Sequence, residues 1–193
     1  MKKVSIIAII IAALGLSFTA IKQATWTYDT NHAKIGFSIT HMMISDVEGY
    51  FKKASATLTS AKDDFSDAVV EMNADASSIF TDNERRDADL KGSTYFDVDK
   101  FPTLSFKSTD FKKTKTLNTY VVKGNLTIHG VTKPITLSVI ARTGTHPMSK
   151  KTIAGFKIIG KLNRTDFGIG VNVPTAMLSD EVLIDCNAEF TKN

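Results

Sequence analysis

The side chains of this sequence that could carry chemistry include two short motifs of arginine and aspartate. Arg86 and Asp87 lie in the stretch TDNERRDADLKGSTYFDV, residues 81–98, and Arg164 and Asp166 form the second motif. A guanidinium is a planar donor that matches a carboxylate in a bidentate pair. Arg86 with Asp166, or Arg164 with Asp87, could therefore hold the first motif against the second and shape an entrance. The alternative is that these groups are unrelated surface charges, which contribute little stability.

Four histidines could suggest a metal site, but their spacing does not support one. His32, His41, His129 and His146 are scattered, with no close pair at ligand spacing and no cysteine cluster beside them. We therefore predict no metal and no cofactor. His41 continues the alternating series Ile35, Phe37 and Ile39, so it would point to the same inward face, where its imidazole could hydrogen-bond a ligand head group. A structural histidine bonded to a neighbouring backbone group is the alternative.

The sequence contains no positive sign of catalysis. A GxSxG nucleophile elbow is absent, and no glycine-rich phosphate loop follows a predicted strand. We therefore predict that the protein is not an enzyme. A lipid- or quinone-modifying enzyme that uses His41 and the arginine and aspartate residues stays open as an alternative, because catalytic groups need not be close in sequence.

The elements that must position these side chains are predicted to be strands. Apolar and polar residues alternate in a series of segments from 35–41 to 182–188, which is the pattern of half-buried strands. Turn signals such as HGVTKP, residues 129–134, separate the segments and favour an antiparallel sandwich or barrel. About eight strands would close a barrel. Several inward positions are small, and they either leave a lumen open or accommodate large neighbours in a filled core: Ala74, Ala76, Gly124, Gly160 and Ala188.

The charged stretch at 81–98 is predicted to contain a short helix. Thr81 followed by Glu84 fits a capping box, the helix would run to about Leu90, and Gly92 fits its end. Its charge excludes a core position, so it would lie across a sheet face or a barrel end with Leu90 turned inward. A later segment, 168–181, mixes glycine and proline with apolar residues. It is either a candidate flap at a barrel mouth or an ordinary packed loop.

The first 20 residues have the pattern of a secretory signal peptide. Lys2 and Lys3 precede an apolar run that extends to about Ala20. We therefore predict a periplasmic or otherwise exported protein with a mature domain at 21–193. The run is slightly short for a membrane span of roughly 20 residues, although its retention as an anchor stays open. The formal net charge of +4 includes these two lysines, and without them it is +2.

The basic residues outside the predicted signal peptide and the single cysteine argue against a nucleic-acid-binding surface and against a reactive thiol. The basic clusters at 112–115 and 150–151 lack interleaved aromatic residues, so we predict no nucleic-acid partner. We also predict no stable membrane insertion after signal removal. Cys186 shares the parity of its apolar neighbours, which predicts a buried, inert thiol.

Five segments of the sequence belong together as one pattern: WTYDTNHAKIGFSITHMMISDVEGYF (26–51), NERRDADL (83–90), FDVDKFPTLSFKST (96–109), GNLTIHGVTKPITL (124–137) and LNRTDFGI (162–169). Taken together, they resemble the YceI-like family of exported polyisoprenoid-binding proteins. They follow the family's order and cover nearly all of the predicted mature chain. One departure is visible: the family pattern RDxHL has histidine where this chain has Asp89, so a head-group contact through that histidine does not carry over.

The resemblance implies a lipocalin-like antiparallel barrel with a helical insertion, whose hollow lumen holds a long isoprenoid or fatty chain. The charged helix would close the lumen from outside. The implied function is sequestration or transport of a polyisoprenoid, an isoprenoid quinone or a fatty-acid derivative. A homodimer and a ligand-free stress-response module with a filled core stay open. The residues predicted to contact the ligand are Ile35, Phe37, Ile39, His41, Val70, Met72, Leu104, Phe106, Leu126, Ile128, Phe156, Ile158 and Ile184.

Overall fold

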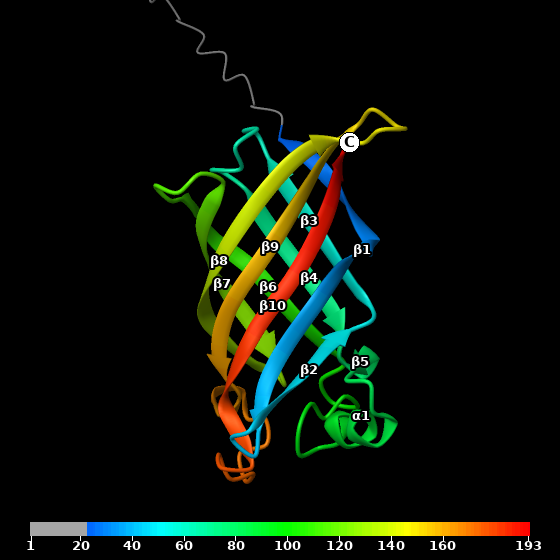
Figure 1. The fold of residues 1–193 in the computed structure, drawn as a ribbon, viewed down its shortest axis with the longest axis vertical. Helices are drawn as coiled ribbons and strands as arrows, with labels where there is room; N and C mark the ends of the chain where they lie inside the picture. Colours follow the sequence, from blue (N-terminus) through cyan, green and yellow to red (C-terminus); the bar gives the residue numbers. More distant parts are fainter. Residues whose placement is uncertain (1–22) are drawn as a thin grey trace, which may run out of the picture.

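The computed structural model describes residues 23–193, so the predicted signal peptide at 1–20 lies outside the described part. This part contains ten strands, one α-helix and two short 3-10 helices (Figure 1). The helices are η1 (Ala76–Ser78), α1 (Glu84–Lys91) and η2 (Arg164–Phe167). The strands are β1 (Ala24–His41), β2 (Ser45–Phe51), β3 (Ala54–Ser60), β4 (Val69–Asp75), β5 (Ile79–Phe80), β6 (Thr103–Lys113), β7 (Thr119–Ile128), β8 (Val131–Thr145), β9 (Thr152–Asn163) and β10 (Leu178–Lys192).

Eight of these strands form a closed antiparallel barrel. They follow one another in the order β10, β9, β8, β7, β6, β4, β3 and β1, and β1 returns to pair with β10. In that closing pair, Trp26 lies opposite Lys192 and Ile39 lies opposite Val182. The prediction of an all-β antiparallel barrel of about eight strands is confirmed. The sandwich alternative is wrong, because a sandwich consists of two separate sheets.

Strand β1 changes its partner halfway along its length. Residues 24–27 pair with β3, whereas residues 35–41 pair with the hairpin strand β2, which in turn pairs with β5. Between the two halves, the register of β1 against β10 shifts from Asp29 to Lys34. Extra residues of this kind bend a strand and turn individual side chains away from the regular alternation. The bend lets one strand take part in the barrel and in the β1–β2 hairpin beside it (Figure 1).

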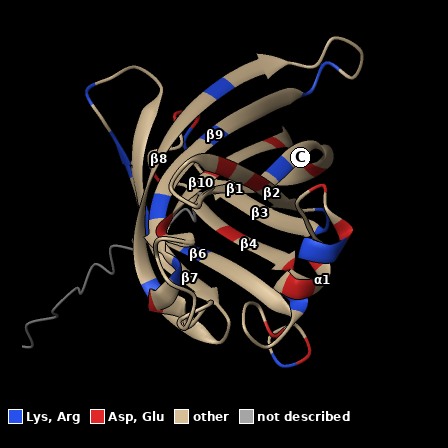
Figure 2. Cartoon of the chain, turned by 60° about the horizontal axis from the view of Figure 1, so that its bottom comes forward, with Lys and Arg blue, Asp and Glu red and all other residues tan. Residues whose placement is uncertain are grey.

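The predicted helix exists, but its first residue was predicted wrongly. The N-cap of α1 is Asn83, whose side chain accepts a hydrogen bond from Arg86 N, and not Thr81. The helix ends at Gly92 as expected, where the backbone N–H donates to Asp89 O. Figure 2 shows α1 beside one end of the barrel, with basic and acidic residues along it. Leu90 packs against the buried residues of the barrel, which confirms its inward orientation.

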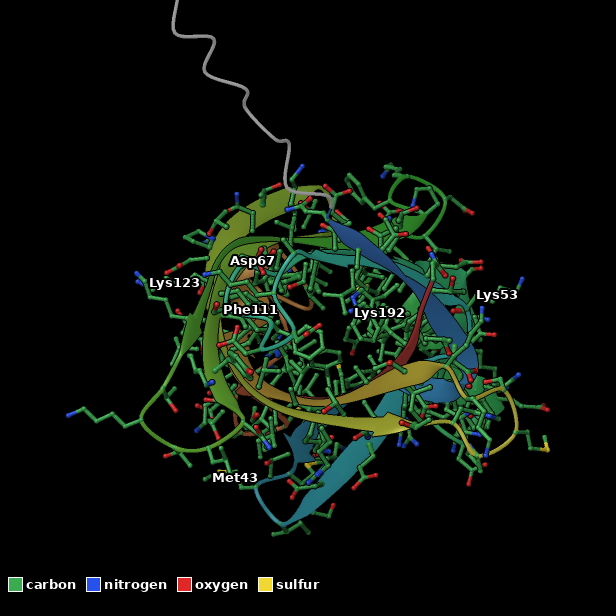
Figure 3. The ribbon with its side chains drawn as sticks, turned by 90° about the horizontal axis from the view of Figure 1, so that it is seen from above. Met43, Lys53, Asp67, Phe111, Lys123 and Lys192 are labelled. Atoms are coloured by element: carbon green, nitrogen blue, oxygen red, sulfur yellow. The ribbon has the colours of Figure 1, made fainter. Side chains whose placement is uncertain are left out.

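The alternation of the strands separates an apolar interior from a polar exterior. In Figure 3 Phe111 lies inside the barrel, whereas Lys123, on the neighbouring strand, lies on the outside. Regular alternation of this kind places successive side chains on opposite faces of a sheet. No helix within residues 23–193 has the length and apolar character that crossing a membrane requires.

Candidate functional site

The barrel encloses a lumen with a volume of about 470 Å³. Every residue predicted from the sequence to contact a ligand lies in the wall of this lumen. The hollow alternative is therefore the one that the structure adopts, while ligand contact itself stays a prediction. The residues are Ile35, Phe37, Ile39 and His41 of β1, Val70 and Met72 of β4, Leu104 and Phe106 of β6, Leu126 and Ile128 of β7, Phe156 and Ile158 of β9, and Ile184 of β10.

Two of the small inward residues accommodate large neighbours and do not enlarge the lumen. A Cβ atom on Gly124 would lie 2.3 Å from Cζ of Phe106, and one on Gly160 would lie 2.4 Å from Cδ2 of Leu137. At these two positions the small residue makes room for a large neighbouring side chain, as the filled-core alternative expects. Of the five small residues predicted to point inward, Ala74 and Ala188 line the lumen.

One end of the lumen is closed by packed aromatic rings. Phe65, from the connection between β3 and β4, has its ring centroid 5.3 Å from that of Trp26 and 5.1 Å from that of Phe156. The ring of Phe156 in turn lies 5.8 Å from that of Phe190, edge to face. All four side chains are buried. Aromatic pairs in such geometry contribute about 0.5–1.5 kcal/mol beyond burial, so this end is a stable floor.

The other end of the lumen reaches solvent and forms its mouth. Of the residues that line the lumen, those classed as exposed are His41, Asp89 and Met177. His41 ends β1, Asp89 lies on α1, and Met177 precedes β10, so three separate elements surround the mouth. The sequence interpretation missed Tyr95 and Phe96, which also line the lumen. Their signal is the pair of adjacent aromatic residues in the connection after the charged helix.

The first arginine and aspartate motif anchors α1 to Thr81, three residues before the helix begins. The Asp87 carboxylate accepts hydrogen bonds from the backbone N–H of Thr81 at 2.9 Å and from its hydroxyl at 2.5 Å. Arg86 donates from Nε to the same hydroxyl oxygen at 2.8 Å and from Nη2 to the Thr81 carbonyl at 2.6 Å. The predicted pairs, Arg86 with Asp166 and Arg164 with Asp87, are therefore wrong. Each motif is satisfied locally, because Thr81 supplies the polar atoms that the first motif needs.

The second motif organises the segment between β9 and β10. Arg164 is 2% exposed and donates hydrogen bonds to backbone carbonyl oxygens, not to a carboxylate. Asp166 instead pairs with Lys133 Nζ at 3.0 Å on the outside of the barrel. The guanidinium has five N–H donors, and each finds a carbonyl. The acceptors are Ser179 for Nε, Ile169 and Gly170 for Nη1, and Val173 and Leu178 for Nη2.

The candidate flap at 168–181 is thus a segment wrapped around the buried guanidinium of Arg164. Its residues Val173, Met177 and Leu178 line the lumen, so the loop does lie at the mouth. Its Gly170 N–H also donates to the Thr94 carbonyl at 2.8 Å, in the connection after α1. The loop and the helical insertion therefore meet at the mouth through backbone contact.

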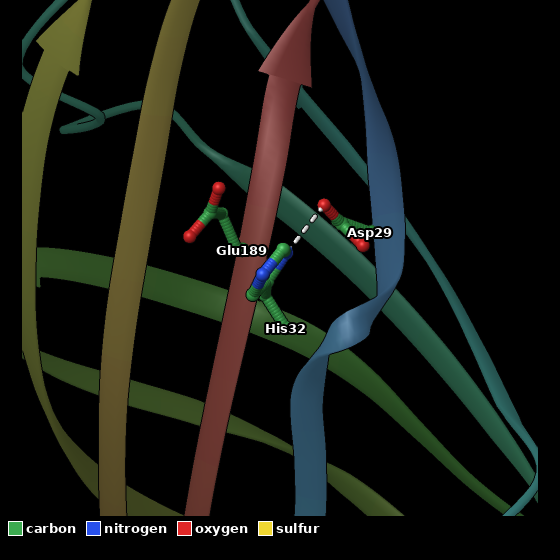
Figure 4. Close-up of side chains that lie close together, drawn as sticks. All are labelled: Asp29, His32 and Glu189. Carbon is green, nitrogen blue, oxygen red and sulfur yellow. Dashed lines mark hydrogen bonds and ion pairs between the residues drawn. The ribbon is translucent and has the colours of Figure 1, made fainter. Parts of the chain in front are cut away.

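One group of side chains on the outer surface could hold a cation. Asp29, His32 and Glu189 bring their ligand atoms within 4.8 Å of one another (Figure 4). The spacing of the histidines alone gave no sign of this group, because Glu189 comes from β10 and lies directly opposite Asp29. His32 Nδ1 and Asp29 Oδ2 are 2.9 Å apart. This hydrogen bond raises the pKa of His32 and lowers the pKa of Asp29.

The thiol of Cys186 lies inside the barrel, as predicted. It is buried in the wall of the lumen, and its Sγ donates to the Gly36 carbonyl at 3.5 Å. Burial raises the pKa of this thiol to about 11. Because the thiolate is the nucleophile, the thiol is poorly reactive near neutral pH.

A reactivity measurement checks this assignment of Cys186. In the folded protein at pH 8, we expect Cys186 to react with a charged aromatic disulfide reagent more than about 100-fold more slowly than in denaturant, because both access and thiolate fraction fall. Equal rates in the two conditions would contradict burial of the thiol.

These features define a class: a lipocalin-like β-barrel with an apolar lumen that is closed at one end. Residues 26–190 match the model of the YceI-like domain, and the chain belongs to this family. It is 32% identical over 174 residues to the UPF0312 protein SA2479 of Staphylococcus aureus, an alignment that covers 88% of this chain and 98% of that protein.

Solved structures share the same fold. The Campylobacter jejuni YceI protein superposes with a TM-score of 0.72 at 28% identity, covering 80% of this chain and 90% of that one. Burkholderia cenocepacia BcnA gives a TM-score of 0.74 at 23% identity, covering 84% and 98%. A polyisoprenoid-binding domain from Saccharophagus degradans gives 0.63 at 13% identity, covering 89% and 100%. The barrel is therefore conserved in shape among chains of low sequence identity.

Proposed function

We propose that this protein binds a long apolar lipid, an isoprenoid or fatty chain, and carries it inside the barrel. The observation that supports this most is the apolar lumen of about 470 Å³ that reaches solvent at one end. Its size falls within the roughly 300–1,000 Å³ that is usual for small-molecule sites. The name of the Saccharophagus neighbour, a polyisoprenoid-binding domain, points to the same class of ligand.

The driving force for binding would be the removal of the chain from water. Each buried CH₂ group contributes about 0.8 kcal/mol, offset in part by ordering of the chain. That force has no direction, so selectivity would depend on the length of the lumen and on polar groups at its mouth. His41, Arg86 and Asp89 line that end, and a polar head group would meet both a cation and a carboxylate there.

Binding and transport of this kind need no catalytic group, so the proposal is a carrier and not an enzyme. Shielding an apolar chain is useful where the chain must cross water. A periplasmic or otherwise exported location, as the N-terminal sequence predicts, would provide such a compartment. Oligomeric state does not enter the proposal, because the lumen lies within one chain.

Native mass spectrometry tests the proposal. The protein, purified from its own host without detergent, should carry an added mass that disappears on extraction with organic solvent and matches an isoprenoid or fatty lipid in the extract. A bare protein mass, together with no uptake of a fluorescent fatty acid or a short isoprenol from solution, would contradict carriage. Conversion of a bound lipid to a new mass over time would instead support the enzyme alternative.

A further inference from the structure

Exposed apolar side chains gather around the mouth of the lumen. The turn between β1 and β2 presents Met43 and Ile44, which are 75% and 86% exposed. The backbone N–H of Met42 donates to the Met177 carbonyl at 2.9 Å, which joins this turn to the loop before β10. We call the exposed apolar residues on these two connections the apolar rim: Met42, Met43, Ile44, Val171 and Met177.

The turn in the rim has a backbone conformation that its residues do not favour. Met42 and Met43 have φ of 52° and 60°, in the left-handed region, and Ile44 N donates to the His41 carbonyl to close the turn. Hairpin turns with positive φ at both central residues favour asparagine and glycine. Side chains with a Cβ are strained there, and exposed methionine and isoleucine add contact between apolar surface and water. Neither the turn nor the barrel therefore requires these residue types.

The rim is continuous with the lumen. Ile39 and His41, on the strand that leads into the turn, line the lumen, and Met177 belongs to both the lumen wall and the rim. An apolar path therefore runs from the interior of the barrel to the tip of the hairpin. In Figure 1 this hairpin and the loop before β10 project from the same end of the molecule.

We propose that the apolar rim docks on the surface of a lipid bilayer, so that the lumen exchanges its chain with the bilayer directly. The chemistry of the exchange rests on the proposed function, whereas the docking rests on the rim. A stable protein interface uses about 20–30 residues on each side, many more than the rim offers. Apolar side chains that enter the head-group region need no complementary surface, since the bilayer adapts to them.

The charges around the rim indicate what kind of bilayer it contacts. Neither residues 35–51 nor residues 168–181 contain lysine or arginine, whereas Asp46, Glu48 and Asp180 lie close to the rim in sequence. The nearby helix α1 carries both signs in equal number, since Arg85, Arg86 and Lys91 are matched by Glu84, Asp87 and Asp89 in its sequence. An anionic surface would therefore give no net electrostatic gain. Docking should depend on apolar contact, remain at high salt and occur on zwitterionic lipid.

Vesicle flotation tests the proposal with a matched control. The wild-type protein should float with vesicles of pure phosphatidylcholine, equally in low salt and at high ionic strength. M43S/I44S should float at least about tenfold less, because the loss of two apolar contacts lowers the partition constant. The control is L117S/M148S, which replaces two residues that are 80% and 85% exposed, and it should float like the wild type. These residues belong to the β6–β7 and β8–β9 connections, which lie at the opposite end of the barrel (Figure 1).

Several outcomes would overturn docking. These are no flotation of the wild type, equal flotation of M43S/I44S, an equal loss in L117S/M148S, or flotation that requires anionic lipid. If the rim binds a protein partner and not a bilayer, the wild-type protein should not float with vesicles. Uptake of a fluorescent fatty acid added from solution separates docking from carriage, since M43S/I44S should keep that uptake. If the wild-type protein floats with vesicles but takes up no lipid, the result would support docking and contradict the proposed function.

Discussion

Replacing Arg164 by alanine is expected to lower the free energy of unfolding by about 3 kcal/mol or more. The substitution removes the hydrogen bonds that the guanidinium donates to five backbone carbonyl groups, and of these five the Gly170 carbonyl keeps a donor, the backbone N–H of Val173. A buried acceptor left without a partner costs about 1–3 kcal/mol, and water that enters the vacated space would recover part of this. For a domain of this size the loss corresponds to a decrease in Tm of roughly 6–12 °C.

The part of the structure that R164A loosens is as informative as the loss of stability. Three of the acceptors lie in the loop before β10, and the other two are the first residues of β10. Limited proteolysis of R164A should therefore cut first between residues 169 and 178, and α1 should stay protected. R164K should behave almost like R164A, since an ammonium cannot reach five carbonyls with three donors. R142A removes an exposed arginine of β8 and should change Tm by less than about 2 °C. First cleavage in α1, or a Tm of R164A equal to that of R142A, would contradict this account.

The second large effect is expected from shortening the lumen at its floor. Ala188 lines the lumen on β10, opposite Phe156 and two residues before Phe190 of the floor. A tryptophan at this position should fill the deep end and exclude the terminal part of a long chain. Each CH₂ group that no longer fits costs about 0.8 kcal/mol, close to fourfold in affinity. A188W should therefore weaken long chains strongly and leave short chains nearly unaffected.

A series of fatty acids or isoprenols of increasing length, measured by native mass spectrometry or dye displacement, checks this expectation. N187W is the matched control, because Asn187 is the neighbouring residue on the same strand and its side chain is exposed. The thermal stability of both variants should be measured in parallel, since overpacking alone costs about 1–3 kcal/mol. Equal binding curves for A188W and N187W at every chain length would show that the lumen does not hold the chain.

The wall of the lumen was predictable from the sequence because strand alternation is a local property. Phe37 and Ile184, for example, share parity with their apolar neighbours, and they lie opposite each other in the closing pair of the barrel. Whether the interior is hollow was not predictable from the pattern alone. That depends on which residues lie opposite each other on neighbouring strands, such as Leu137 and Gly160, and the sequence alone does not reveal this pairing. The resemblance to a family supplied this part of the prediction.

The polar residues of the mouth were identified, but their partners were not. Arginine and aspartate suggested ion pairs, whereas Arg164 binds carbonyl groups of a loop whose path no local pattern encodes. Thr81 was predicted as a helix cap because it lies three residues before Glu84. It instead follows β5 directly and bonds to Asp87, so the cap falls on Asn83. Both errors concern tertiary contacts that outweigh a local preference.

The closing pair of strands has a consequence for how the molecule is made. Thr27 of β1 donates to Asn193, just after β10, at 2.6 Å across 166 positions of sequence, so the barrel cannot shut until the last strand has been synthesised. Pairing over such separations folds slowly, because the entropy of closing the loop must be overcome before any contact compensates for it. During that interval the edge of β1 and the apolar faces of the earlier strands stay accessible to chaperones and to other nascent copies. The yield of native protein should therefore depend on the integrity of the final strand more than on that of any other strand.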